Sequence, residues 1–357
     1  MSRFSKIAAQ LDAYGLDAMM ITSWPNRLYA TQFRSSAGMA IVTKNESYFF
    51  TDTRYIEAAK KTITDAVIRI NTNDVSLTDL ANEAIKAHHI QKLGFEDQYA
   101  TVSEYNDWQK KLACKELVPA TELLTELRKV KDEEEVKCLI AAQRIAEKAL
   151  KDVLEFIKPG RTEKEISAYL QYRMLSHGAE KMSFEPIVVS GANSSMPHGV
   201  PSDKKVEDGD FVTMDFGCVY GGYCSDMTRT VAVGHVTEEM EKVYYTVLEA
   251  QKAGIAAARA GVTGKSVHEA AAKVIADAGY GEYFGHGFGH SLGVEIHENP
   301  RFSLANDKPV PAGAAMSAEP GIYIPGKFGV RIEDVIIIRE DGCMDIMEAP
   351  HELIILK

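Results

Sequence analysis

The chain has 357 residues, of which 45% are hydrophobic and 25% are charged, and its formal net charge at pH 7 is −11. A chain of this length usually folds as more than one domain, and the acidic balance argues against nucleic-acid binding. No apolar stretch reaches the ~18 residues of a membrane span, and the N-terminal segment lacks the apolar core of an export signal, so we expect a cytoplasmic protein without a membrane partner.

Residues 1–125 alternate between helix and strand patterns, which is typical of an α/β domain. A helix is expected to stop at Gly15, and a second helix is expected to begin after Ser76, a good N-cap residue. The expected helices cover residues 5–14 and 76–89, and the expected strands cover residues 18–21, 39–42 and 47–51; an apolar step follows the second helix at residues 92–95.

The second domain is placed at residues 126–357. A charged run at residues 128–135 opens a long helix there, and its acidic side chains fall in the first turns, where the helix dipole favours them. We therefore interpret this run as the start of a solvated helix at the domain boundary.

The second domain contains an internal repeat. Thr162 and Glu165 form the pattern of a capping box at the start of a helix, and Ser266 and Glu269 repeat it about a hundred residues later. Each of these helices is expected to end at a glycine and to give way to strand-like sequence.

The repeat continues through residues that can take part in chemistry. Each half has a histidine close to a proline, His198 and His297, and then an acid at the same distance after a glycine, Asp215 and Glu319. The recurrence of the whole order predicts two related halves that face each other across a site. The fold class is therefore an α/β N-terminal domain followed by an α+β domain with internal pseudo-two-fold symmetry.

Two aspartates are expected to lie on the same face of a β-hairpin. Asp215 is in one strand, residues 220–222 form the turn, and Asp226 is in the returning strand. With a loop of either two or four residues, the two side chains are diagonal or directly opposite. Carboxylates this close repel each other unless a cation lies between them, which favours a metal site over a pair of solvent-facing acids.

Two further acids are candidates for the same site. Residues 331–338 predict a buried strand with Arg331 and Glu333 on one face, and a buried acid needs a partner. A structural ion pair with Arg331 therefore stays open beside metal binding. Glu319 becomes a stronger candidate for a metal ligand because the repeat matches it with Asp215.

Two histidines lie in a segment rich in glycine, residues 285–293. No glutamate separates them as in the helical H-E-x-x-H motif, and the glycines allow the backbone to approach a ligand closely. We expect His290 to be a ligand and His286 to have a structural role. Four carboxylates and one imidazole suit manganese, or cobalt or iron in its place, better than a zinc site made of thiolates.

These residues, in their local sequences, resemble the five metal ligands of the pita-bread metallopeptidases, the family of methionine aminopeptidase, aminopeptidase P and prolidase. The matching positions are Asp215 in MDFG, Asp226 in CSDMTRT, His290 in GHGFGHSLG, Glu319 in AEPGIY and Glu333 in VRIEDV. The resemblance covers residues 130–357, and the N-terminal domain is similar to that of the aminopeptidase P and prolidase branch.

The resemblance implies two divalent metal ions, most often Mn(II), with Co(II), Fe(II) or Zn(II) as alternatives. It implies that Asp215 and Glu333 bridge the ions and that Glu319 is also the general base. Further roles are implied for five residues: His198 and His297 as stabilisers of the tetrahedral intermediate, Arg331 as the arginine that orients the bridging glutamate, Tyr323 as a substrate-binding tyrosine near the metal pocket, and Arg301 as a partner of a substrate carboxylate.

The activity implied by this resemblance is hydrolysis of the Xaa-Pro bond in dipeptides or short peptides. The alternatives are an aminopeptidase P, which acts on longer peptides, and a non-enzymatic scaffold that keeps the fold. Short proline-containing peptides are the expected partners, and a homodimer is the expected assembly.

Overall fold

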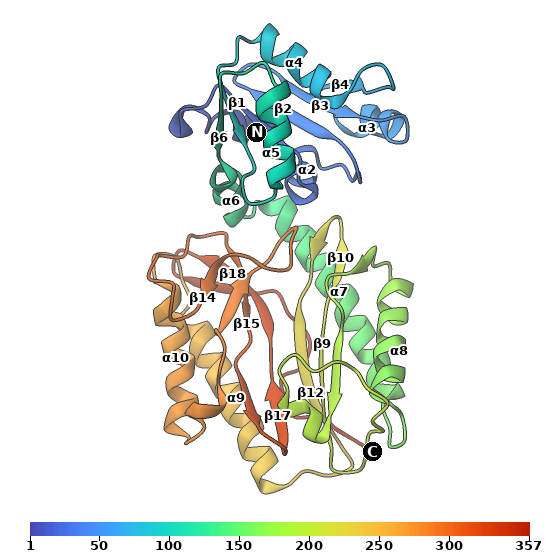
Figure 1. Ribbon diagram of the computed structural model, residues 1–357. Coiled ribbons are helices and arrows are strands. Elements are labelled where there is room, and N and C mark those ends of the chain that lie inside the picture. Colours follow the sequence, from blue (N-terminus) through green and yellow to red (C-terminus); the bar gives the residue numbers. More distant parts are fainter. The chain divides into compact units, whose positions relative to one another are not determined.

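The computed structural model describes all 357 residues, and the chain divides into two compact units, residues 1–128 and 129–357. The first unit is built on a six-stranded mixed sheet in the order β4-β3-β2-β1-β5-β6 (Figure 1). Its elements are α1 (Arg3–Ala8), β1 (Ala18–Ile21), α2 (Trp24–Thr31), β2 (Met39–Thr43), β3 (Ser47–Thr51), α3 (Ile56–Thr62), β4 (Val67–Ile70), α4 (Leu77–Ala87), β5 (Lys92–Phe95), α5 (Val102–Lys111), β6 (Glu116–Pro119) and α6 (Thr121–Lys129).

The first unit is the α/β domain that the sequence predicts. The three expected strands form as β1, β2 and β3, the apolar step at residues 92–95 is β5, and Ser76 caps α4 in a capping box with Asp79. The expected helix over residues 5–14 is shorter, because α1 ends at Ala8 and only a 3-10 turn follows before Gly15, whose φ of 65° ends it. Apolar side chains of the helices cover both faces of the sheet as two separate core clusters.

The second unit contains the remaining helices and strands. They are α7 (Glu133–Phe156), α8 (Glu163–Ser176), β7 (Lys181–Met182), β8 (Ile187–Ser190), β9 (Phe211–Phe216), β10 (Cys218–Tyr220), β11 (Tyr223–Cys224), β12 (Met227–Val233), α9 (Glu238–Ala257), α10 (Gly264–Asp277), β13 (Gly289–Ser291), β14 (Glu298–Phe302), β15 (Ala315–Ala318), β16 (Gly321–Ile324), β17 (Phe328–Arg331), β18 (Asp334–Arg339), β19 (Gly342–Asp345) and β20 (Ile355–Leu356).

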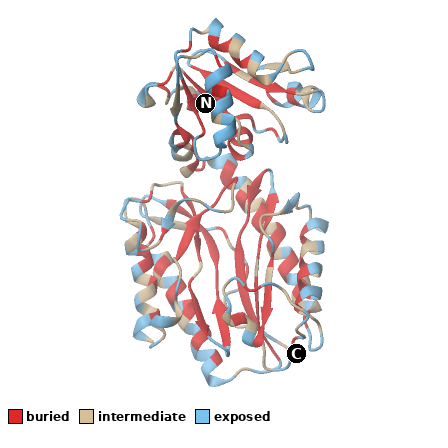
Figure 2. Cartoon of the chain, in the orientation of Figure 1, coloured by how far each residue is buried: buried red, intermediate tan, exposed pale blue.

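The predicted repeat is confirmed in this unit. The first half contains the antiparallel strands β8, β9 and β12 and the helix pair α7 and α8, and the second half contains β13, β15 and β18 with α9 and α10. The strands lie between the two helix pairs (Figure 1). In Figure 2 the strands are almost continuously buried, whereas the helices expose their outer faces. Each half has its own apolar core, between its sheet and its helices.

Helix capping follows the sequence in one half and differs in the other. Thr162 caps α8 and forms the expected capping box with Glu165. In the second half the N-cap of α10 is Thr263, and the expectation that Ser266 opens this helix is wrong. Ser266 is already inside the first turn, where its N–H donates to Thr263 Oγ1 at 3.1 Å.

Two strands that the sequence suggests to be continuous are interrupted. The strand expected from Tyr223 to Val233 breaks before β12, at Asp226. The strand expected over residues 331–338 divides into β17 and β18, which pair with β16 and β15, respectively. The chain passes from one sheet to another at Glu333, and a bridge between Thr228 and Glu333 joins the two halves there.

None of the helices combines the length and the apolar composition that crossing a bilayer requires.

Candidate metal centre

Asp215 and Asp226 are held by the hairpin that begins with β9. The turn is two residues long, because Tyr220 pairs with Tyr223 and both glycines between them have positive φ. The same register continues into β12, where Asp215 pairs with Thr228, so Asp226 is diagonal to Asp215. The register predicted for the shorter loop is therefore confirmed.

The other acids are placed by the corresponding strands of the second half. Glu319 directly follows β15 and Glu333 directly precedes β18, and the neighbouring residues Ala318 and Asp334 pair across these two strands. His290 lies in the middle of β13, the next strand in the same sheet. Four of the predicted ligands thus lie at or beside a strand end, and His290 lies within a short strand.

These five side chains converge. His290 Nε2 is 3.5 Å from Asp226 Oδ2 and 3.3 Å from Glu319 Oε1. The possible ligand atoms of Asp226, His290 and Glu333 all lie within 4.8 Å of one another. Asp215 completes the set, and all five residues line the same cavity.

Hydrogen bonds fix the orientation of the converging side chains. Thr228 Oγ1 donates to Glu333 Oε2 at 2.7 Å. Ser317 Oγ donates to Glu319 Oε1 at 2.8 Å and accepts from the backbone N–H of His290 at 2.9 Å. Such contacts hold a ligand in one orientation before an ion arrives.

Arg331 binds a different acid from the one considered in the sequence. Its Nη2 donates to Asp215 Oδ2 at 2.5 Å, and its Nε donates to Thr228 Oγ1 at 2.9 Å. Arg331 therefore forms no ion pair with Glu333. The two side chains are linked only through the Thr228 hydroxyl, which accepts from Arg331 and donates to Glu333. The reason is the interruption between β17 and β18: Arg331 is the last residue of β17, whereas Glu333 lies between the two strands and pairs with Thr228 in an isolated bridge.

The buried carboxylates destabilise one another's charged forms. Burial, and then the charges of Asp215 and Glu319, raise the pKa of Asp226 well above its usual value. Burial and the charges of Asp226 and Glu319 do the same to the pKa of Glu333. Burial lowers the pKa of His290 to about 4, so this imidazole is neutral at pH 7 and free to bind a cation.

The donor set fits divalent metal ions. Cations between these carboxylates would offset the repulsion that raises their pKa values. Asp215 Oδ1 is also buried without a hydrogen-bond partner, although its other oxygen is bound by Arg331. A buried polar atom in this state normally requires a ligand, and oxygen donors with one imidazole suit manganese or a related metal.

The cavity in front of this centre has a volume of about 430 Å³, within the range of small-ligand sites. His198 and His297 line it, as the sequence predicts, and neither imidazole has a hydrogen-bond partner in the protein. Arg301 also lines it, and its guanidinium is likewise without a partner. Sequence reasoning missed the rest of the wall, which includes Phe184 and Ile296; no local pattern marks these apolar residues.

Tyr323 lies behind the cavity wall. Its hydroxyl accepts from Arg331 Nη1 at 2.8 Å and forms a hydrogen bond with His286 Nε2 at 3.0 Å. His286 itself lines the cavity. Tyr323 is therefore near the metal centre, as expected, but it is placed to contact these two side chains rather than a ligand in the cavity.

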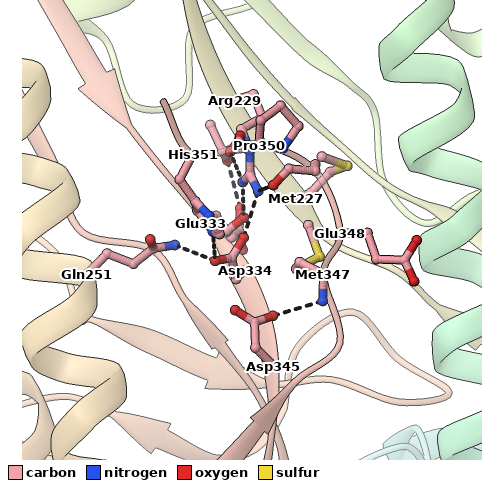
Figure 3. Close-up of polar contacts among 12 residues, drawn as sticks. Met227, Arg229, Gln251, Glu333, Asp334, Asp345, Met347, Glu348, Pro350 and His351 are labelled. Carbon is pink, nitrogen blue, oxygen red and sulfur yellow. Dashed lines mark hydrogen bonds and ion pairs between the residues drawn. The ribbon is translucent and has the colours of Figure 1, made fainter. Parts of the chain in front are cut away.

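A second cluster of acids and histidine lies on the other side of these strands and was also missed by sequence reasoning (Figure 3). Asp334, Asp345 and His351 bring potential ligand atoms within 4.8 Å of one another. The guanidinium of Arg229 already contacts Asp334 at 2.8 Å, so the charge of this buried carboxylate is balanced within the protein. The signal in the sequence was a second acid, directly after Glu333, in an apolar segment.

Comparison with known proteins agrees with this geometry. Residues 137–340 match the model of metallopeptidase family M24, and residues 3–130 match that of the creatinase/prolidase N-terminal domain. The chain therefore belongs to metallopeptidase family M24, and its second unit has the pita-bread fold of that family.

Solved structures similar to this chain include proteins named for activity on proline peptides. An Xaa-Pro dipeptidase from Bacillus anthracis is 41% identical, with 99% of both chains covered and a TM-score of 0.95. An X-Pro aminopeptidase from Thermotoga maritima is 36% identical, with 96% of this chain and 98% of that one covered and a TM-score of 0.92. The prolidase from Pyrococcus horikoshii is 35% identical, with 99% of both chains covered and a TM-score of 0.90.

Proposed function

We propose that the protein is a dinuclear-metal Xaa-Pro dipeptidase, which hydrolyses dipeptides whose second residue is proline. One observation carries the dipeptide assignment: the carboxylate-rich centre shares its cavity with Arg301, a guanidinium without a partner in the protein. The carboxylate of a dipeptide lies one residue beyond the scissile bond, so a cation close to the metal centre can bind it. The names of the relatives from Bacillus anthracis and Pyrococcus horikoshii support the same assignment.

The five converging residues Asp215, Asp226, His290, Glu319 and Glu333 would hold two divalent ions, with Mn(II) as our first choice and Co(II), Fe(II) or Zn(II) as alternatives. When bound, such ions polarise a carbonyl and lower the pKa of water, so that a nucleophile is available at neutral pH.

Glu319 is the proposed general base and proton shuttle. Its Oε1 is engaged by Ser317 and lies close to His290, whereas its Oε2 makes no hydrogen bond within the protein. Oε2 is therefore the atom that can take a proton from the attacking water and pass it to the proline nitrogen as the peptide bond breaks. The contact with Ser317 keeps the carboxylate in one orientation during this exchange.

His198 and His297 are the proposed stabilisers of the tetrahedral intermediate. Both line the cavity, and the ring of His297 lies 4.5 Å from that of His290 in an edge-to-face arrangement. Because neither ring donates to the protein, their N–H groups can donate to the carbonyl oxygen as its negative charge develops. Arg331 has a different proposed role, which is to hold Asp215 in place.

An aminopeptidase acting on longer Xaa-Pro peptides is the second candidate, because the relative from Thermotoga maritima carries that name. The experiment that separates the two compares an Xaa-Pro dipeptide with an Xaa-Pro-Xaa tripeptide, using the purified protein loaded with Mn(II). Cleavage of the dipeptide alone supports the dipeptidase, and cleavage of the tripeptide with a poor dipeptide rate supports the aminopeptidase.

Absence of both activities would overturn the proposal and favour a non-enzymatic scaffold. Two variants serve as controls, because each removes a proposed ligand: Asp226→Ala and His290→Ala. Hydrolysis that survived both changes would not come from this centre. On family resemblance we also propose a cytoplasmic homodimer, and light scattering of the purified protein tests the assembly.

A further inference from the structure

The strands that present the metal centre are joined on their other side by a buried ion pair (Figure 3). Arg229 of β12 donates through Nη2 to Asp334 Oδ1 of β18 at 2.8 Å, and their side chains are 3% and 0% exposed. A buried ion pair is weak evidence of stabilisation, because the cost of removing both charges from water offsets their attraction. The role of the Arg229–Asp334 pair must therefore be inferred from the other hydrogen bonds that the two side chains form.

Every other hydrogen bond of the Arg229 guanidinium goes to a backbone carbonyl. Nη1 donates to Thr228 O at 3.0 Å and to Glu333 O at 2.7 Å. Nη2 also donates to Ala349 O at 3.0 Å, and Nε donates to Pro350 O at 3.0 Å. All five N–H groups of the side chain are used. They fasten the peptide of a proposed ligand, Glu333, to β12 and to the segment that precedes β20.

Through Gln251, Asp334 also links this hydrogen-bond network to β15. Its Oδ2 accepts from Gln251 Nε2 of α9 at 3.1 Å and is also bound by His351 Nε2. The same Gln251 amide donates to Ala318 O at 3.3 Å, and Ala318 directly precedes Glu319. The network thus contacts the backbone beside two proposed ligands on different strands.

We propose that Arg229 and Asp334 are positioning residues that hold Glu333 and Glu319 in place and thereby set the affinity of the centre for divalent ions. This inference rests on the proposed function. The carboxylates repel one another before a cation arrives, so their backbones must be fixed by contacts outside the centre. An ion pair suits this task, because the charge of Asp334 offsets that of Arg229 and leaves little net positive charge behind a site for cations.

Metal binding itself is the test. The metal-free full-length protein is titrated with Mn(II) in a calorimeter, and with Co(II) while the visible absorption of the bound ion is recorded. We expect Arg229→Lys, which keeps the charge but has fewer donors, and Asp334→Asn to weaken binding on the order of 10–100-fold and to change the Co(II) spectrum.

Two controls separate positioning from a general loss of stability. Arg173→Lys alters another ion pair of the same unit, in which Nε lies 2.7 Å from Asp152 Oδ2, and Leu170→Ala removes apolar core from α8. We expect both to bind Mn(II) within about twofold of wild type, even where the melting temperature of the metal-free protein falls. Equal losses of affinity in Leu170→Ala and Arg229→Lys would overturn the proposal.

A double variant keeps the test decisive if the single variants fail to fold. Arg229→Met combined with Asp334→Leu removes both charges together, a change that buried ion pairs often tolerate. We expect the folded double variant to bind Mn(II) weakly, and wild-type affinity in it would overturn the inference. A wild-type protein that bound no divalent ion would instead refute the proposed function, and this inference with it.

Discussion

Arg301 lies directly opposite His290 in the antiparallel pairing of β13 and β14. Residues that face each other in such a pair project from the same side of the sheet, so the guanidinium lies on the side of the metal centre. Both residues line the cavity, and the guanidinium of Arg301 forms no hydrogen bond or ion pair within the protein, although its backbone carbonyl accepts from Asn306 Nδ2 at 2.7 Å. Its position therefore defines one end of the proposed dipeptide site.

Replacing Arg301 with leucine should raise KM for an Xaa-Pro dipeptide by about 10-fold with little change in kcat, because a charge-assisted hydrogen bond to the substrate carboxylate is lost. The matched variant Arg301→Lys keeps the charge and should lose less. Steady-state kinetics on the dipeptide and on its C-terminal amide provide the measurement. An effect of equal size on the amide would contradict a contact with the carboxylate.

Glu185 lines the same cavity as Arg301, and like the Arg301 guanidinium its carboxylate has no partner within the protein. It lies two positions before Ile187, which pairs with Asp215 across β8 and β9, and it is exposed without a hydrogen bond or ion pair. We expect it to favour a basic first residue in the substrate. Glu185→Gln should lower the ratio of kcat/KM for Lys-Pro over Glu-Pro by about 2–5-fold, the range of an exposed charge pair.

The control for this prediction is Glu155→Gln, which removes an exposed acid of α7 outside the cavity wall. It should leave the ratio unchanged, because its carboxylate does not line the cavity that would bind the substrate. The same ratio in wild type and in Glu185→Gln would show that this carboxylate does not contribute to substrate selection.

Local chemistry explains what the sequence predicted correctly. The capping box at Thr162 depends on side chains a few residues apart, and it forms as expected. The two-residue turn fixes the register of its hairpin, which places Asp215 diagonal to Asp226. Both predictions involve neighbours in the chain, so no knowledge of the tertiary structure was required.

Long-range packing explains what the sequence did not predict. The apolar run over residues 331–338 has the pattern of one strand, but the chain changes sheets at Glu333 to pair with Thr228 of the other half. This pairing joins residues more than a hundred positions apart. Arg229 is also more than a hundred positions away from Ala349 and Pro350, whose carbonyls it contacts, and no local sequence pattern predicts these contacts.

Asp345 should make stability depend on pH. Asp345 is exposed as a residue, but partial desolvation of its carboxyl, and then the charge of Asp334, raise its pKa from 3.8 to about 7. A carboxyl whose pKa is higher in the folded state favours folding below pH 3.8, and this contribution is lost as the pH rises through about 7. We expect Asp345→Asn to melt at a higher temperature than wild type at pH 8.

At pH 4 the melting temperatures of the two proteins should lie close together, since the wild-type carboxyl is then protonated in the folded state. The hydrogen bond from the backbone N–H of Met347 to Asp345 Oδ1, at 2.8 Å, can be kept by the asparagine oxygen. Scanning calorimetry of the metal-free protein across this range is the measurement. A difference that was equal at both pH values would exclude ionisation as its cause.

Tyr323 is the residue for which sequence and structure suggest different roles. Its buried hydroxyl lies between Arg331 and His286, and it does not line the cavity. If it acts only through these two side chains, Tyr323→Phe should lower kcat while KM for the dipeptide stays within about twofold. The metal-free variant should also lose about 1–3 kcal/mol of unfolding free energy, because a buried donor of Arg331 loses its nearest acceptor.

Measuring kcat, KM and chemical denaturation on the same preparation distinguishes this role from direct binding of the substrate. A direct contact between the Tyr323 hydroxyl and the substrate would instead raise KM by more than about twofold in Tyr323→Phe. His286→Asn provides the matched comparison, since it removes the other partner of the hydroxyl and changes the cavity wall itself. We therefore expect KM to respond to His286→Asn and kcat alone to respond to Tyr323→Phe.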